Sequence, residues 1–376
     1  MNRAKLFYLF FYGGQAALVP FLTLYYQSLG LGGAAIGLLA GLVPLASMVS
    51  GSLWNGAADA TRRYRAVLLL AVAGAWLGAL LVSRAGGLAA LLPTVLLMAI
   101  FSAPIAPLVD SSVVALLGER RADYGRVRLW GSVGWMLTAL AAGPLLERYG
   151  LNWMFVLHLG LMAVVFVVAA RLPLAQSVAV PGVSFGTRLG VLLRQRAYLG
   201  LLAVALVFGM ALSIILSYLF LHLSGLGAGE TVMSLTLSIA TASEIPFLFL
   251  SGWFLRRLGV RGVIVLALLF MAVRVFGYAW LPTAGWAVAV SVLHGPAYAL
   301  LWSAGVAESY RLAPAGLGAT AQGAFTTAMF GLGSAIGSFA GGVVYQRAGA
   351  PFLFEATGWL VLATLAGYLV LERRAA

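Results

Sequence analysis

The chain has 376 residues, of which 62% are hydrophobic and 9% are charged. A soluble domain has about half apolar and about a quarter charged residues, so this composition excludes a soluble fold and indicates a membrane protein with several spans. The chain contains no cysteine, which excludes disulfides, thiolate catalysis and cysteine-ligated metals. The net charge of +13 would suit nucleic acid only if the basic residues clustered on one soluble face, and they lie instead between apolar runs.

Twelve apolar runs are each long enough to cross ~30 Å of hydrocarbon. In chain order they cover residues 5–29, 33–57, 64–83, 88–117, 124–147, 151–173, 196–223, 231–255, 261–281, 285–311, 318–346 and 350–371. The first run is too long for the apolar core of a signal peptide, so we interpret it as a retained helix. The pattern predicts an all-α membrane protein with twelve transmembrane helices.

Lysine and arginine are unevenly distributed between the two sides that these runs would define. If both termini are cytoplasmic, eighteen of the 23 basic residues fall on the cytoplasmic side. Three fall outside, namely Arg84, Arg148 and Arg347, and two, Arg128 and Arg274, fall within apolar runs. Because cytoplasmic loops carry the excess of Lys and Arg, we expect an integral protein of the inner or plasma membrane with both termini in the cytoplasm.

The twelve runs divide into two similar halves. The segment Gly56–Arg65, between the second and third runs, resembles Gly252–Arg261 between the eighth and ninth. The end of the fifth run, Gly143–Gly150, likewise resembles Gly342–Gly349 at the end of the eleventh. Two six-helix repeats of this kind, forming two pseudo-symmetric bundles, are the architecture of major facilitator transporters. The predicted domains are an N-terminal six-helix bundle over 1–174, a polar cytoplasmic linker over 175–194 and a C-terminal six-helix bundle over 195–376.

One acid lies deep inside an apolar run of the second half. Glu244, in the sequence Ser243-Glu244-Ile245-Pro246, is ~18 to 21 Å along a helix from the nearest charged residue on either side. Arg274 and His294 fall at a similar depth in the next two runs. An acid, a cation and an imidazole that meet inside a membrane can hold a proton in one state and release it in another, so we predict a proton-coupling role. The alternative is a permanent Glu–Arg bridge that only fixes helix packing.

The first half carries its own charged pair, Asp110 in the fourth run and Arg128 in the fifth. A planar guanidinium facing a carboxylate suits sugar hydroxyls or a substrate carboxylate. Trp135 lies two turns beyond Arg128 on the same helix face, where it could stack on a ring. We predict substrate binding by these three residues and, on weaker grounds, by Gln322 in the eleventh run. The alternative is an ion pair at the membrane edge with Trp135 in packing.

Other polar features have simpler interpretations. A superfamily-wide signature for a cytoplasmic gating loop matches the residues Gly56, Asp59, Arg62, Arg63 and Arg65, although the arginines also serve as a topology signal. Glu308 is three residues from Arg311, which predicts an ion pair at the membrane edge. Enzyme signatures, a phosphate-binding loop and a metal-ligand spacing of histidines are absent, so we expect neither an enzyme nor a cofactor.

Two stretches carry a resemblance to a known family: Ala-Pro-Leu-Val-Asp at 106–110 and Asp-Tyr-Gly-Arg-Val-Arg-Leu-Trp-Gly-Ser-Val-Gly-Trp at 123–135. They closely resemble helices 4 and 5 of the lactose permease and phenylpropionate permease branch of the major facilitator superfamily, and the likeness extends over all twelve runs. The resemblance implies that Asp110 and Arg128 hold sugar hydroxyls and that Trp135 stacks on the sugar ring. It also implies that Arg274 and His294 match the helix-9 arginine and helix-10 histidine of that branch.

The chain departs from that branch at two positions. The branch has its coupling acid where this chain has Ala297, and a helix-8 acid about one turn before Glu244, where this chain has Thr241. Glu244 is therefore the only deeply placed acid of the second half, and we predict that it carries the proton.

The sequence therefore predicts a secondary active transporter. We expect proton-coupled uptake of a small organic solute, such as a sugar, a nucleoside or an aromatic acid, by alternating access. The expected partners are that solute, protons and the lipid bilayer, with no nucleic acid, and the expected functional unit is a monomer. Two alternatives are a proton-driven exporter or antiporter and a transporter-like membrane sensor that moves no solute.

Overall fold

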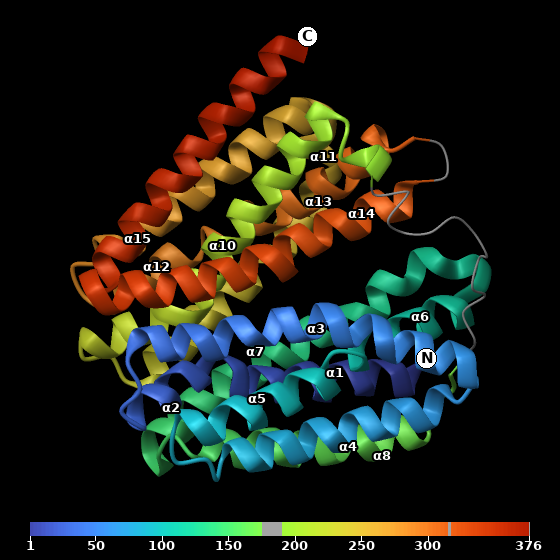
Figure 1. Ribbon diagram of the computed structural model, residues 1–376, viewed down its shortest axis with the longest axis vertical. Coiled ribbons are helices and arrows are strands. Elements are labelled where there is room, and N and C mark those ends of the chain that lie inside the picture. The colour runs from blue at the N-terminus through green and yellow to red at the C-terminus, as the bar shows by residue number, and fades with distance from the viewer. Residues whose placement is uncertain (175–189, 315–316, 376) are drawn as a thin grey trace. The chain divides into compact units, whose positions relative to one another are not determined.

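The computed structural model describes residues 1–174, 190–314 and 317–375, and it leaves the side chains of residues 55, 119, 121, 122 and 372–375 undescribed. Most of the predicted linker, 175–189, lies outside the described residues. Within the described residues every regular element is helical (Figure 1). The prediction of an all-α membrane protein is confirmed.

The chain divides into two compact units, one formed by Met1–Val180 with Gly229–Ser238 and the other by Pro181–Ala228 with Ile239–Ala376. The elements before residue 175 are α1 (Asn2–Leu18), η1 (Val19–Phe21), α2 (Leu22–Ser28), α3 (Gly33–Thr61), α4 (Tyr64–Val82), α5 (Leu88–Ser102), α6 (Ile105–Leu117), η2 (Gly118–Asp123), α7 (Tyr124–Tyr149) and α8 (Trp153–Ala170). The elements after residue 195 are α10 (Arg196–Gly225), α11 (Glu230–Ala279), α12 (Trp286–Ser291), α13 (His294–Leu312), α14 (Gly318–Thr326), η3 (Thr327–Gly333) and α15 (Ser334–Ala375). The predicted domain boundaries at 174 and 195 stay a prediction.

Ten helical stretches among the described residues are long and apolar enough to cross a membrane. Two of them, Glu230–Ala279 with 50 residues and Gly318–Leu371 with 54, are far longer than one span requires. Each contains a glycine with positive φ, Gly259 at 67° and Gly349 at 78°, where the helical backbone is interrupted. Each stretch is therefore long enough for two membrane spans that meet at its glycine, and the predicted count of twelve is supported roughly rather than helix by helix.

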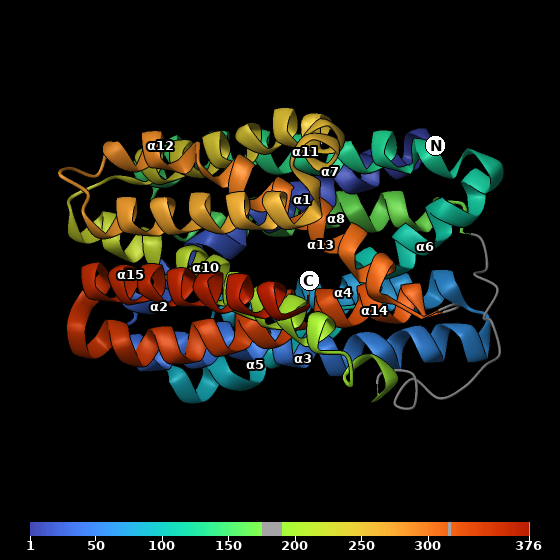
Figure 2. The ribbon, with the colours of Figure 1, turned by 90° about the horizontal axis from the view of Figure 1, so that it is seen from above.

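Close backbone contacts between helices recur in both units. In the first unit α1 packs against α7 and α8, and α4 packs against α5 (Figures 1 and 2). A Cβ on Gly134 of α7 would collide with the backbone carbonyl of Leu9 on α1. In the second unit α10 packs against α15 and η3, and a Cβ on Gly209 of α10 would collide with the carbonyl of Met329. Small residues at such crossings let membrane helices approach closely without a hydrophobic driving force.

Candidate functional site

A hydrogen-bonded chain of three ionisable side chains lies inside the second unit. Arg274 Nη1 is 2.8 Å from Nδ1 of His294, and His294 Nε2 is 2.6 Å from Oε1 of Glu244. Glu244 and Arg274 both belong to α11, on either side of the break at Gly259, and His294 is the first residue of α13. The three residues that sequence depth singled out are therefore in contact.

The direction of these hydrogen bonds fixes the tautomer of His294. A guanidinium only donates, so Nδ1 of His294 must accept the bond from Arg274. The single proton of a neutral His294 then lies on Nε2, which donates to the Glu244 carboxylate. A second proton on the imidazole would need Nδ1, and Arg274 would have to move away first. His294 therefore cannot be an imidazolium while its Nδ1 accepts the hydrogen bond from Arg274.

The backbone around this chain holds α11 and α13 close together. The N–H of Gly295 donates to Oγ of Ser243 at 2.9 Å, next to Glu244. A Cβ on Gly295 would collide with the carbonyl of Ser243, so only glycine permits this approach. The sequence reasoning did not single out this pair. The sequence does contain a clue to this contact, because a small residue stands beside each titratable one: Ser243 before Glu244 and Gly295 after His294.

Burial distinguishes the two ends of the chain. Arg274 is 4% exposed and its guanidinium lies 5.4 Å from the ring centroid of Tyr278, a cation–π distance. The side chains of His294 and Glu244 are 16% and 19% exposed. Arg274 Nε has no hydrogen-bond partner among the described residues. The cation is thus sealed inside the unit, whereas the acid end is partly accessible.

The first unit holds a second polar cluster around Asp110 on α6 and Arg128 on α7. The hydroxyl of Tyr8 on α1 donates to Oδ1 of Asp110 at 2.5 Å, and Tyr124 at the start of α7 lies close enough to interact with the same carboxylate. The Arg128 guanidinium lies 4.0 Å from the ring centroid of Tyr12 and 5.4 Å from that of Tyr8. Asp110 and Arg128, both described by the structure, make no direct ion pair. Tyrosines of α1 separate them.

Sequence reasoning missed Tyr8 and Tyr12, which lie four residues apart and therefore on one face of α1. A Cβ on Gly131, three residues after Arg128, would meet the Tyr12 ring, so this glycine makes room for the ring beneath the guanidinium. Trp135 is half-buried on the same helix, and its indole N–H makes no hydrogen bond with a described residue. Gln322 on α14 is half-buried, and no hydrogen bond joins its side chain to the described Arg274–His294–Glu244 chain.

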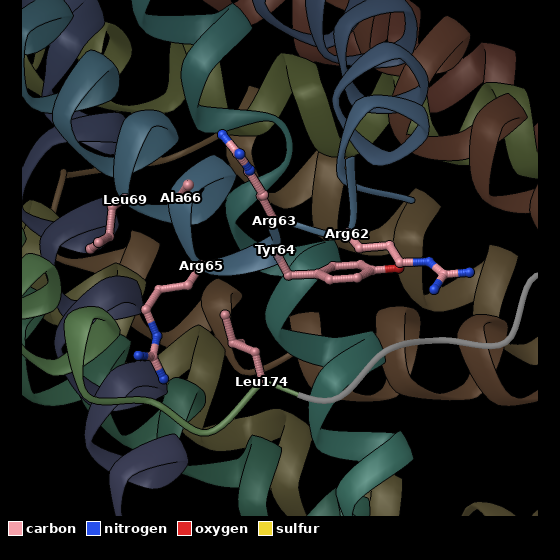
Figure 3. A pocket seen from close by; sticks show the side chains of 7 residues that line it. All are labelled: Arg62, Arg63, Tyr64, Arg65, Ala66, Leu69 and Leu174. Carbon is pink, nitrogen blue, oxygen red and sulfur yellow. The ribbon is translucent and has the colours of Figure 1, made fainter. Parts of the chain in front are cut away.

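The predicted gating residues lie at the junction between α3 and α4. Asp59 Oδ1 accepts a hydrogen bond from the Tyr64 hydroxyl at 2.5 Å, rather than a bond from a helix N-terminus. Arg62 ends α3 with a left-handed backbone, φ 57° and ψ 19°. A pocket of about 490 Å³ is lined by Arg62, Arg63, Tyr64, Arg65, Ala66, Leu69 and Leu174. Figure 3 shows the three guanidinium groups pointing away from one another, so they do not converge on one anion. Gly56 is exposed on α3.

Two further expectations concern charges outside these clusters. Arg311 Nε and Nη2 donate to the two oxygens of Glu308 at 2.7 and 2.5 Å, which confirms the predicted ion pair. Glu308 is 5% exposed, so the bidentate guanidinium satisfies a buried carboxylate. Among the described residues no group of three His, Cys, Asp or Glu side chains could hold a metal ion.

Comparisons with known proteins agree on one class. A family model described as "MFS_1 like family" matches residues 1–356. Maltose permease of Geobacillus stearothermophilus is 31% identical over 97% of this chain and 92% of its own length. The uncharacterized transporter YwbF of Bacillus subtilis strain 168 is 24% identical over 91% of this chain and 86% of its own. The crystal structure of a mutant of the nucleoside transporter NupG has a TM-score of 0.89 at 16% identity, covering 98% of this chain and 99% of that one, which shows a shared fold.

Proposed function

This chain belongs to the MFS_1 like family, and on that premise we propose that it is a proton-coupled symporter that takes up a sugar. It is an integral membrane transporter of the major facilitator type with a small-molecule substrate, and it is not an enzyme. The proposal adds the coupling ion, the direction and the substrate class to that statement. The observation that carries it is the hydrogen-bonded chain from Arg274 through His294 to Glu244.

In the proposed cycle Glu244 carries the transported proton. Its carboxylate accepts the Nε2 proton of His294 and is partly accessible, so it can take a proton without disturbing Arg274. Protonation of Glu244 removes the negative charge that accepts the bond from the imidazole. The buried Arg274 then leaves the three side chains with one net positive charge. Release of the proton restores the bond to His294. The protonated and deprotonated states differ in charge at Glu244, and this difference can shift the conformational equilibrium of alternating access.

The cluster in the first unit is the proposed substrate site. Asp110 and Arg128 offer an acceptor and a planar donor, and Trp135 offers a flat surface with an unpaired N–H on the same helix. Together these groups suit a hydroxylated ring. The 31% identity to a maltose permease supports a sugar, and the fold shared with a nucleoside transporter makes a nucleoside the second candidate. Gln322 stays a weaker candidate for the same role.

The remaining assignments are also proposals. The cytoplasmic gate would be formed by Gly56, Asp59, Arg62, Arg63 and Arg65, with the Tyr64 hydroxyl donating to Asp59. Both termini would lie in the cytoplasm of a cell bounded by the inner or plasma membrane, as the excess of arginine on one side indicates. The functional unit would be a monomer.

Uptake into proteoliposomes tests the proposal. Purified protein is reconstituted, and maltose, uridine and 3-phenylpropanoate are supplied outside with and without an inward proton gradient. We expect maltose to accumulate above its external concentration only with the gradient, and a protonophore to abolish the accumulation. If folded protein moves none of these solutes in response to the gradient, the proposal is wrong. Gradient-driven loss of preloaded maltose would favour the exporter instead.

A further inference from the structure

The ten tryptophans of the chain fall into three groups by exposure and hydrogen bonding. Two are anchored, because the indole N–H of Trp54 donates to the Ile100 carbonyl at 3.1 Å and that of Trp76 to the Leu159 carbonyl at 3.0 Å. Six are exposed to 39% or more: Trp130, Trp153, Trp253, Trp280, Trp286 and Trp359. The other two, Trp135 and Trp302, are half-buried and their N–H groups make no hydrogen bond with a described residue.

Trp302 therefore differs from an ordinary packing residue. A buried or half-buried indole N–H usually finds a partner inside the protein, as those of Trp54 and Trp76 do. Trp135 already belongs to the proposed substrate site. Trp302 combines partial burial with an N–H that has no partner among the described residues, but it lies in the second unit, away from the Asp110–Arg128 cluster.

Aromatic rings on α13 form a continuous stack that ends at Trp302. The rings of His294 and Tyr298 are 5.4 Å apart with an interplanar angle of 12°, and those of Tyr298 and Trp302 are 6.5 Å apart, also at 12°. Phe330 lies 5.9 Å from Trp302 and 6.4 Å from Tyr298. We call Tyr298, Trp302 and Phe330 the aromatic platform. It begins one helical turn from the imidazole that binds Glu244.

Phe330 is held in an unusual backbone. It lies in η3, a seven-residue π-helical segment between α14 and α15, and π-helical turns are rare and often occur at functional sites. Close packing against α10 fixes this segment, because a Cβ on Gly333 would collide with the Leu206 carbonyl. Phe330 is nevertheless 38% exposed, whereas Phe325, whose ring centroid is 6.2 Å from that of Trp302, is fully buried. The platform is thus packed against the core at Phe325 and accessible at Phe330.

The platform continues from two ionisable groups, His294 and Glu244, which argues against a lipid-facing position. Charged and titratable side chains inside a membrane face the bundle interior or a water-filled cavity, since exposure to hydrocarbon is costly. His294 and Glu244 keep 16% and 19% of their side chains exposed, so both are partly accessible. The rings of Tyr298 and Trp302 continue the stack that begins at His294.

We propose that the aromatic platform binds the ring of the transported solute and that the Trp302 N–H donates a hydrogen bond to an acceptor at the edge of this ring. Aromatic faces suit the flat, weakly polar face of a sugar ring or a nucleobase, and an open-chain polyol offers no such face. The inference rests on the proposed transport function and makes it more specific. It places a ring-recognising surface in the second unit, next to the proton-coupling residues.

Direct binding to purified protein tests this inference without requiring transport. Isothermal titration with maltose, uridine and open-chain sorbitol is compared for the wild type, Trp302→Phe, Trp302→Ala and Trp280→Ala. Trp280 is 63% exposed and stacks on Phe276 at 5.2 Å, so its removal is a control for loss of an indole away from the platform. Thermal melting of each variant reports whether it is folded.

We expect Trp302→Ala to weaken ring binding by roughly tenfold or more, because a stacking contact and a hydrogen bond are lost together. Trp302→Phe keeps a ring but not the donor, so its loss should be smaller, about threefold to tenfold on the same reasoning. Trp280→Ala should bind as the wild type does, and sorbitol should bind no protein measurably. Maltose and uridine are separate arms, and the one that responds to Trp302 identifies the kind of ring.

Three results would overturn the inference: unchanged ring affinity in folded Trp302→Phe, sorbitol binding as tight as ring binding, or wild-type protein that binds neither maltose nor uridine. Proton-driven accumulation in proteoliposomes separates this from the proposed function. If maltose binding depends on Trp302 but maltose is never accumulated, the inference on the aromatic platform holds and the proposed proton coupling is wrong. If maltose is accumulated but its affinity does not depend on Trp302, the proton coupling holds and the inference on the platform is wrong.

Discussion

The two units connect an acid to an arginine in different ways. In the first, tyrosines separate the charges: Tyr8 donates to Asp110 and Tyr12 lies under Arg128. In the second, the imidazole of His294 joins Arg274 to Glu244. A phenol keeps its proton at neutral pH, whereas the imidazole of His294 accepts from Arg274 and donates to Glu244. The first cluster therefore has a fixed pattern of hydrogen-bond donors suited to binding. In the second, a proton taken up by Glu244 would change the hydrogen bonding of His294 as well, which suits coupling.

Neutralising the acid of the second cluster should have the largest effect. Glu244→Gln keeps the shape of the side chain but cannot give up a proton, so we expect complete loss of maltose accumulation while exchange across the membrane continues. Accumulation and counterflow in proteoliposomes measure the two activities. Glu355→Gln, a change of the same chemistry on α15, should leave both intact. Uphill accumulation by Glu244→Gln would remove this residue from the coupling role.

Separating α11 from α13 should come next. Gly295→Ala places a methyl group against the Ser243 carbonyl, so the helices must move apart and the His294–Glu244 bond must lengthen or break. We expect proton-driven uptake to fall about tenfold or more, the loss that corresponds to one charge-assisted hydrogen bond. Gly323→Ala on α14 has open space around its Cβ and is the matched control. Equal uptake rates for the two variants would contradict the importance of this approach.

In the first cluster, Arg128→Lys tests whether shape matters as well as charge. Lysine keeps the positive charge but loses the planar fork and the flat contact with Tyr12. We expect KM for maltose to rise about tenfold because one of two parallel hydrogen bonds is lost, with little change in the gradient dependence of uptake. Initial uptake rates over a range of maltose concentrations give both quantities. A variant with normal KM but no response to the proton gradient would reverse the roles of the two units.

Tyr8→Phe should give the smallest effect of the four. It removes one hydrogen bond from Asp110 and leaves Arg128 and Tyr12 in place, so KM should rise about threefold to tenfold. Tyr12→Phe keeps the ring under Arg128 and should change KM less. The same kinetic measurement compares them. If Tyr12→Phe were the more damaging variant, the Tyr12 hydroxyl rather than the Tyr8–Asp110 bond would matter for binding.

Sequence reasoning found the second cluster more completely than the first, for a physical reason. Glu244, Arg274 and His294 are conspicuous because each is costly at its depth in an apolar run, and residues of similar depth in neighbouring helices tend to meet. Tyr8 and Tyr12 are ordinary in a membrane helix. Their role depends on the rotation of α1 about its axis relative to α6 and α7, which hydropathy does not encode.

The fold shows the same limit. Apolar length predicts each span, but the glycine contact that brings Gly295 against Ser243 and the π-helical turn that holds Phe330 depend on packing between distant segments. Trp302 illustrates this limit well. The sequence offers it together with Tyr25, Tyr26, Tyr218 and Tyr298 as a residue that could line a cavity or merely pack. Its ring neighbours, and an N–H without a partner among the described residues, distinguish it.

The order of donors in the second cluster also gives the chain of hydrogen bonds a polarity. Every bond is donated in the direction from Arg274 toward Glu244, and the arginine at one end has no lone pair with which to accept a proton. A proton can therefore join this relay only at the carboxylate. Whichever side of the membrane supplies the proton, a water path must reach Glu244. Blocking access to the Glu244 carboxylate would therefore stop proton uptake without any change to His294 or Arg274.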